Sequence, residues 1–547
     1  MRTSVIGGEE GHRGFLSGRR SNTELGVALA AVVLWLVLMN RFGVWGFFVG
    51  IVILFVVFIG LRKDADGLPP WHGWVKKGRM RERRKSGTDY FIPYSLIPDE
   101  DVVPDMSGLN RRERAEKVKE LAAYREVPDG VEGLSWVRQE PGSTAVAKHV
   151  PTGEEPYLSV VFAVDGPVQG LHGDGFISDA QYRFGQLLAG WGAASKLVSG
   201  VQTMTRVIPV DSAKHEAWMQ SELDESVPDI VIDSYQSVLN ELGQTSFVQR
   251  HFAVVRFNLT SAFGFAASRR GDGEEGWLTV IDEQVEAALR RFREAMFTGV
   301  RALSGPQVAA VLRHLQHPDW PIDRASDVTP ETCWFPSHDE WSHTEIVGEY
   351  PDRYDPNIYH EQTSWYHRTA WLPPAAFEQR EVDGLFLSPL LIGLSDQIVR
   401  TISTHIHLIP ARVAKGRARS DHTADQAERH EQARKGRIMD DDMELAATAS
   451  ARRVHDLSSG TGHHGTSWGG FITISARSVE ELREASVKVE EAADAAGITR
   501  LLWEDTFQSA AASATWPMMR GVVPEKDGFL SSVKIGGNSG SSKEALT

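Results

Sequence analysis

Two long uncharged apolar runs near the N-terminus constrain this chain more than any other feature. Leu25 to Met39 is a run of fifteen residues without a charge, and Phe42 to Leu61 is a run of twenty. A helix needs about 20 predominantly apolar residues to cross the hydrocarbon core of a bilayer. We therefore expect a transmembrane helical hairpin over residues 25–61, in which the shorter first span uses flanking residues or locally thinned bilayer.

A signal peptide is the competing interpretation of the first run, because Arg13, Arg19 and Arg20 precede it. No small-x-small cleavage site precedes the second run, and cleavage would leave that run in place. The hairpin accounts for both runs.

Basic residues flank the expected hairpin on both sides, and Lys and Arg are retained on the cytoplasmic side of a membrane. We therefore expect both termini and the soluble body to be cytoplasmic. Cations near anionic lipid contribute about 1 kcal/mol each. We expect a lipid-facing basic collar made of Lys76, Lys77, Arg79, Arg81, Arg83, Arg84 and Lys85. The alternative is a solvated run that serves only to set the topology.

The rest of the chain has the composition of a globular protein, with 41% hydrophobic and 24% charged residues over 547 positions. That length leaves room for several structural units. Cys333 is the single cysteine, which excludes an intramolecular disulfide and a thiolate zinc cage. The chain is neither a disulfide scaffold nor a small single module.

Hydrophobic periodicity predicts an α+β body made of two ferredoxin-like αβ units. In the first unit, strands are expected at 157–164, 203–210 and 251–258. A long helix follows them, with one buried stripe formed by Val285, Leu289, Phe292, Met296, Val300 and Leu303. In the second unit, strands are expected at 401–409, 470–476 and 498–503. A helix there should begin with a capping box of Ser478 and Glu481 and end at Gly497.

These patterns divide the chain into seven segments. We expect a cytoplasmic tail at 1–24, the hairpin at 25–61, a basic juxtamembrane segment and linker at 62–130, a first αβ unit at 131–316, a loop-rich connection at 317–395, a second αβ unit at 396–525 and a disordered Gly/Ser-rich tail at 526–547.

One predicted loop partly matches the sequences of two catalytic motifs. Gly460, Gly465 and Ser467 have the spacing of a phosphate-binding loop, and residues 465–469 match the G-x-S-x-G nucleophile elbow. Thr466 stands where the phosphate loop needs Lys. Both motifs also need a strand before and a helix after, whereas the pattern here predicts the reverse. We therefore expect no catalytic residues and no nucleotide hydrolysis.

The histidine pairs and the acidic run do not build a metal site. The pairs are His314 with His317, His405 with His407, and His463 with His464, whereas zinc needs three or four ligands. The run Asp440 to Asp442 lacks the Gly and Glu spacing of a calcium loop. Because these ligand sets are incomplete, we expect no metal and no cofactor. A basic stripe at 412–437 is typical of a solvated helix, so we also expect no direct nucleic-acid contact.

The order of these parts resembles a known family. The segments that carry the resemblance are the hairpin, the basic collar, Thr401 to Pro410, Phe471 to Leu482 and Ala511 to Arg520. The chain resembles actinobacterial membrane proteins encoded with conjugation machinery. Its body is similar to the N-terminal, non-motor domain of the type IV secretion ATPase, and its hairpin is similar to the two-span membrane subunit of that system.

This resemblance implies a non-enzymatic scaffold in the bacterial plasma membrane. Because the chain ends about where the motor would begin, the scaffold would recruit a separate motor ATPase for DNA transfer, as a homo-oligomer together with other membrane subunits and anionic lipid. Two alternatives remain: a core membrane component of a type VII-like secretion system, and a membrane-tethered serine hydrolase that uses Ser467.

Overall fold

The computed structural model describes residues 4–6, 22–61, 72–96, 110–168, 172–193, 197–209, 222, 227–245, 247–349, 362–378, 380–382, 384–394, 398–434, 441–458 and 463–521. Within these residues the chain forms thirteen α-helices and a large mixed sheet, so the expected mixture of α and β structure is confirmed. The tail at 526–547, Gly460 and the side chains of the 440–442 acidic run lie outside the described residues.

Fourteen strands form the central sheet. They are β2 (Tyr90–Pro93), β3 (Tyr124–Arg125), β4 (Leu134–Arg138), β5 (Val146–His149), β6 (Tyr157–Asp165), β7 (Gly200–Pro209), β8 (Phe247–Asn258), β9 (Thr298–Ala302), β10 (Ser337–Asp339), β11 (Thr344–Gly348), β12 (Thr363–Leu372), β14 (Val399–Ile409), β15 (Gly465–Ala476) and β16 (Leu502–Trp503). Two short strands, β1 (Ser4–Ile6) and β13 (Arg380–Val382), pair separately.

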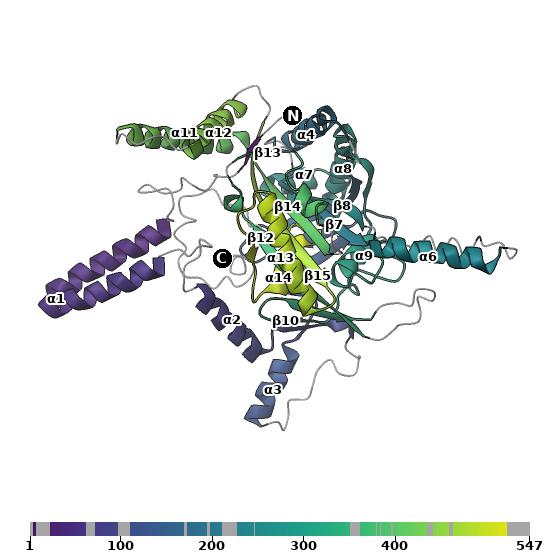
Figure 1. The fold of residues 1–547 in the computed structure, drawn as a ribbon, viewed down its shortest axis with the longest axis horizontal. Coiled ribbons are helices and arrows are strands. Elements are labelled where there is room, and N and C mark those ends of the chain that lie inside the picture. Colours follow the sequence, from purple (N-terminus) through teal and green to yellow (C-terminus); the bar gives the residue numbers. More distant parts are fainter. Residues whose placement is uncertain are drawn as a thin grey trace.

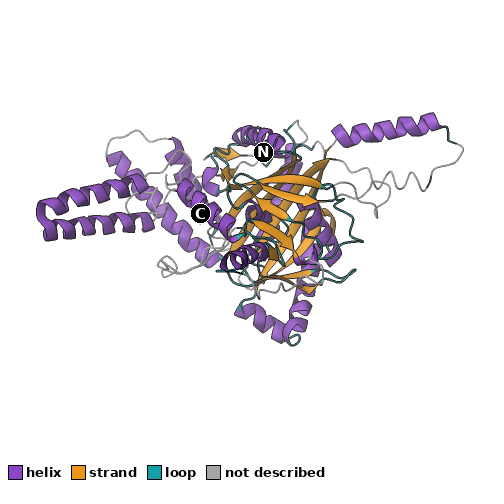
Figure 2. Cartoon of the chain, turned by 90° about the horizontal axis from the view of Figure 1, so that it is seen from below, coloured by secondary structure: helices purple, strands orange, loops and turns teal. Residues whose placement is uncertain are grey.

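The helices surround this sheet and also extend beyond it (Figure 1, Figure 2). They are α1 (Asn22–Leu61), α2 (His72–Ser86), α3 (Arg111–Leu121), α4 (Asp174–Trp191), α6 (Asp229–Thr245), α7 (Ser261–Ser268), α8 (Gly273–Glu294), α9 (Gly305–Gln316), α10 (Ser388–Leu391), α11 (Ala411–Arg434), α12 (Asp441–Asp456), α13 (Val479–Ala495) and α14 (Gln508–Ala512). Figure 1 shows α1 and α6 projecting from opposite sides of the body.

The order of the strands joins two groups into one sheet. The main path is β3-β2-β10-β11-β12-β15-β14-β7-β8-β6-β5-β4, with β16 beside β12 and β9 beside β6. β7 and β14 pair antiparallel, from Gly200 opposite His407 to Val207 opposite Arg400. Because this pairing is continuous, the two halves of the body share one sheet.

Apolar side chains pack on both faces of the sheet. On one face, α4 and α8 cover a core that includes Phe162 and Phe292, and α13 covers a second core that includes Ile472 and Val489. A third core contains most of α9 together with Met204. Fully burying one large apolar side chain contributes roughly 1.5–3 kcal/mol, so these cores hold the helices against the sheet.

The expected helix of the second unit is present as α13. The Ser478 side chain accepts a hydrogen bond from the Glu481 N–H at 3.2 Å, and Leu482 and Val489 are buried. The Glu481 carboxylate accepts from the Arg477 N–H at 3.1 Å, one residue before the expected partner. Gly497 has φ 76°, the left-handed conformation that ends a helix.

The predicted stripe from Val285 to Leu303 was wrong in its second half. α8 ends at Glu294, and Val300 lies in strand β9. Met296 has φ 70°, and the Phe297 N–H donates to the Phe292 carbonyl at 3.0 Å, which closes the helix. Apolar residues continue in the strand because it pairs with β6, so the helical spacing there is coincidental.

The stretch 317–395 is not a loop-rich connection. It contains β10, β11 and β12, and β12 pairs with both β15 and β16. The strand was missed because His367 and Thr369 are polar yet buried, which hides the alternation expected of a half-buried strand. The second group of strands therefore begins at Thr363 rather than after 396.

Candidate membrane interface

Helix α1 is long and apolar enough to cross a membrane. Its segment Val27–Phe58 has a mean hydropathy of 2.3, and only 11% of the most apolar window is buried. A core helix of a soluble protein would be mostly buried, whereas Trp45 is 80% exposed here. A signal sequence near the N-terminus would also meet the criteria of length and composition. Among the residues that the structure describes, the exposed apolar surface of α1 is the part best suited to contact lipid.

The helix is interrupted at Gly43, which has φ 56° and ψ −131°. Across this interruption the Trp35 Nε1–H donates to the Phe47 carbonyl at 3.3 Å, although twelve residues of continuous helix would span about 18 Å. The two halves of α1 therefore lie side by side (Figure 1). A Cβ at Gly46 would lie 1.9 Å from the Leu38 carbonyl oxygen, so this approach requires glycine there.

The four expected span boundaries all fall within α1. The helix begins at Asn22, three residues before Leu25, and ends at Leu61. Between Met39 and Phe42 the backbone is helical, and the non-helical residue follows Phe42 directly at Gly43. Glycine adopts a positive φ without a steric penalty, which explains why the break lies there rather than at Asn40 and Arg41.

Helix α2 carries the basic collar, and the collar has two faces. Met80 and Arg83 are buried against the body, and Lys76 and Arg79 are partly buried beside them. These positions recur every three or four residues, so they form one stripe along the helix. The remaining members, Lys77, Arg81, Arg84 and Lys85, are exposed together with Trp74, which is 79% exposed.

The Arg83 guanidinium is the centre of the contact between α2 and the body, and the residue is 7% exposed. One nitrogen, Nη1, donates to Asp339 Oδ2 at 2.7 Å and to the Thr506 carbonyl at 2.8 Å. The other, Nη2, donates to Asp129 Oδ2 at 2.6 Å and to the Thr88 carbonyl at 3.0 Å. Two carboxylates and two carbonyls use the fork geometry that arginine provides and lysine does not.

Arg83 therefore faces the body and cannot reach lipid headgroups. Lys76 also points toward the body, because its Nζ lies 3.4 Å from the Trp503 carbonyl oxygen. Arg84 pairs with Glu340 at 2.5 Å, but both side chains are exposed, so this pair contributes little to stability. The residues of the collar that remain suited to lipid lie on the exposed face of α2.

Burial and neighbouring charges shift the pKa values of the ionisable groups around this contact. Burial lowers the pKa of Arg83, but Asp339 and Asp129 outweigh that effect, so its pKa is raised. Burial raises the pKa of Asp129 to about 6, against the opposing effect of Arg125 and Arg83. Burial likewise raises the pKa of Glu504 to about 7, with Lys76 opposing the shift.

The partners of Arg83 could not be found from the sequence. Asp129, Asp339 and Thr506 lie 46, 256 and 423 residues away along the chain. Asp339 is further held by Ser509, whose Oγ–H donates to it at 2.7 Å. No local motif marks any of these positions.

The other residues considered in the sequence do not form a reactive site in the described part of the chain. Ser467 lies within β15, opposite His407 in the antiparallel pair with β14, rather than on a turn between a strand and a helix. His314, His317 and His405 are buried, and no group of three potential metal ligands occurs among the described residues. Burial raises the pKa of the Cys333 thiol, so that thiol is a poor nucleophile.

No protein-family model and no curated protein matches this sequence.

We expect the exposed face of α2 to bind anionic lipid. A chain that begins at His72 should sediment with phosphatidylserine vesicles at low salt. Each cation contributes about 1 kcal/mol, so the variant K77Q/R81Q/K85Q should lose about 3 kcal/mol of binding free energy. The matched control is R111Q/R112Q/K119Q, which removes three exposed cations from α3. Equal binding by the two triple variants would contradict a lipid-facing role for α2.

Proposed function

We propose that this protein is a non-enzymatic plasma-membrane scaffold of an actinobacterial conjugative, type IV-like secretion apparatus, and that it recruits a separately encoded motor ATPase. The observation that carries the proposal is the buried Arg83 contact, which fixes α2 to the large sheet, and α2 follows the apolar helix α1 along the chain. A scaffold needs such a joint, because a partner bound to the body must be held at a fixed place relative to the membrane.

Within this proposal α1 forms a two-span hairpin with both termini in the cytoplasm. The contact of Trp35 with Phe47 across Gly43 supports the hairpin. The cations of the preceding tail and of α2 support the topology, because positive residues remain on the cytoplasmic side.

The proposal also includes two ferredoxin-like units, and the strand orders support it. Each group contains four strands that follow one another among the strands of the central sheet. The first and second strands of a group flank the third, and the third and fourth flank the first. The groups are β9-β6-β8-β7 and β16-β12-β15-β14, and all their pairs are antiparallel. This order matches the split βαβ arrangement described for ferredoxin-like folds, and it therefore supports the proposal.

Exposed apolar side chains on the body are suitable places for an ATPase to bind. Val487, on the outer face of α13, is 54% exposed. We expect the contact in the second unit, between about residues 397 and 517, because the resembled ATPase continues into its motor after this unit. A specific contact should bury upwards of about 1,000 Å².

A photo-crosslinking amino acid at Val487 should capture the motor ATPase in cells, and deletion of the body should abolish DNA transfer while α1 stays inserted. The matched control places the same amino acid at Phe265 of α7, which is also exposed but belongs to the first unit. If positions throughout 150–520 capture no ATPase and transfer proceeds without the body, the scaffold proposal is wrong. Capture of type VII secretion subunits instead would favour that alternative.

A further inference from the structure

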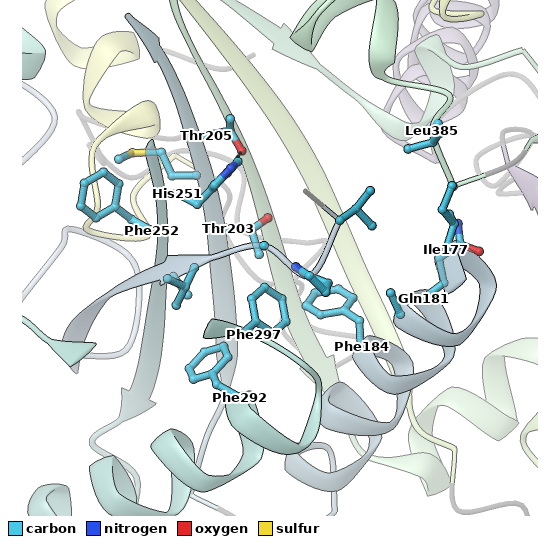
Figure 3. A pocket seen from close by; sticks show the side chains of 18 residues that line it. Ile177, Gln181, Phe184, Thr203, Thr205, His251, Phe252, Phe292, Phe297 and Leu385 are labelled. Carbon is cyan, nitrogen blue, oxygen red and sulfur yellow. Dashed lines mark hydrogen bonds between the residues drawn. The ribbon is translucent and has the colours of Figure 1, made fainter. Parts of the chain in front are cut away.

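A cavity of about 310 Å³ lies between α4 and the sheet (Figure 3). Helix α4 lines it with one stripe of side chains, including Ile177, Ala180 and Phe184. Phe292 and Phe297, at the end of α8 and just beyond it, close a second side. The cavity therefore has a mostly apolar wall, built mainly by helix and strand.

Three polar side chains meet on the sheet side of this cavity. Thr203 and Thr205 are alternate residues of β7 and so lie on the same face of the strand. His251 of β8 is opposite Thr205, and its Nδ1 lies 3.0 Å from the Thr205 hydroxyl. Burial lowers the pKa of His251, with Asp165 opposing, so the imidazole is neutral at pH 7.

The turn before α10 contributes exposed residues to the lining of the cavity. Gly384 lies directly against Gln181 of α4, because a Cβ at this glycine would be 1.5 Å from the Gln181 Nε2. Leu385, the next residue, lines the cavity and is half exposed. An apolar side chain at an opening provides a wall for the apolar part of a ligand.

The size and lining of the cavity define the class of molecule that fits. Protein interiors are close-packed, so a space of this size within the layer between helix and sheet is unusual. At the roughly 30 Å³ that one water occupies in the liquid, it has room for about ten non-hydrogen atoms. None of its lining residues is Asp, Glu, Lys or Arg, so a charged group would be desolvated there without a counterion.

We propose that this cavity is a binding site for an uncharged amphiphile of about ten non-hydrogen atoms. Its polar group would hydrogen-bond at Thr205 and His251, and its apolar body would lie among Phe184, Phe292 and Phe297. Such molecules concentrate at the surface of a bilayer, next to which this body would be held. The choice of ligand rests on the proposed membrane location, but the site uses no residue of α2 or of the α13 surface, so it can be tested separately from the secretion proposal.

The test uses the full chain in lipid nanodiscs and a photoactivatable diazirine analogue of 1-octanol. After illumination, mass spectrometry of the peptides should find label on α4 and β8, in addition to the label expected on lipid-exposed α1. Excess 1-octanol should remove at least nine-tenths of the label on α4 and β8. Equal concentrations of octanoate or octylammonium should not, because the cavity offers no counterion. Equal competition by all three compounds would overturn the proposal.

Ala180→Leu fills the cavity from α4 and should reduce label on α4 and β8 at least tenfold, while label on α1 stays unchanged. Gln186→Leu adds the same side chain to the exposed face of the same helix and is the matched control. Ala253→Leu, which fills the cavity from the sheet, should repeat the loss. Equal label in Ala180→Leu and Gln186→Leu would show that the octanol analogue binds elsewhere. The competition series on the unaltered protein tests the proposal without any variant.

Discussion

Replacing Arg83 with Ala should lower the free energy of unfolding of the body by about 3–5 kcal/mol, which is the cost of breaking a buried ion pair from one side. The variant leaves Asp339, whose side chain is 1% exposed, without its cation, and it leaves the Thr506 carbonyl without a donor. It also removes the guanidinium that lies 4.4 Å from the centre of the Phe507 ring. We expect α2 to detach from the body before the sheet unfolds.

Denaturant unfolding in detergent, followed by tryptophan fluorescence, measures this loss, and limited proteolysis between α2 and β2 reports the detachment. Arg81→Ala, which removes an exposed cation from the same helix, should change stability by less than about 0.5 kcal/mol. Arg83→Lys should recover only part of the loss, because one ammonium cannot serve two carboxylates and two carbonyls in a plane. Equal stability of the Arg81 and Arg83 variants would show that this contact does not hold α2.

The features that the sequence predicted correctly depend on neighbours in the chain. α13 was predicted from Ser478 and Gly497, which act within one turn of the residues they cap. The apolar character of α1 is likewise a local property. Such signals survive because no distant contact is needed to produce them.

The features that were missed depend on distant partners. β12 is identified as a strand by its pairing with β15, in which His367 contacts Ser475 across the sheet. The two faces of α2 could not be distinguished from the sequence either. Arg83 contacts Asp339 and Arg81 is exposed, but both are arginines within the same basic run. A basic run contains no information about which of its members is buried, so the whole collar was assigned to lipid.

Acid should destabilise the body, because several histidines, including His314, His367 and His405, are buried in their neutral form. Burial lowers the pKa of His314 to about 3, of His367 to about 3 and of His405 to about 4, and the Arg206 cation adds to the effect at the first two. His367 has no room for a second proton, since its Nε2–H donates to the Gln316 carbonyl and its Nδ1 accepts from Ser475, both at 2.8 Å.

The direction of the pH effect follows from comparing folded and unfolded chains. Because each folded-state pKa lies below the unfolded value of about 6.5, these groups contribute nothing above that pH and destabilise progressively as the pH falls. At pH 4.5 each of the three histidines lowers the free energy of unfolding by about 3 kcal/mol. Asp129 and Glu504 act in the opposite direction, because their raised pKa values penalise the charged carboxylate at pH 7, and they offset about 4 kcal/mol of the loss.

The free energy of unfolding should therefore fall between pH 7 and pH 4.5, measured by denaturant titration at each pH. His405→Gln keeps a donor for the Ala514 carbonyl, which His405 Nε2 meets at 2.7 Å, but cannot take up a proton. This variant should therefore reduce the fall in the free energy of unfolding between pH 7 and pH 4.5 by about 3 kcal/mol. His172→Gln changes an exposed histidine and is the control that should keep the slope of the unaltered protein. Identical slopes for the two variants would mean that His405 is protonated without cost, and that the layer between β14 and the segment around Ala514 admits water.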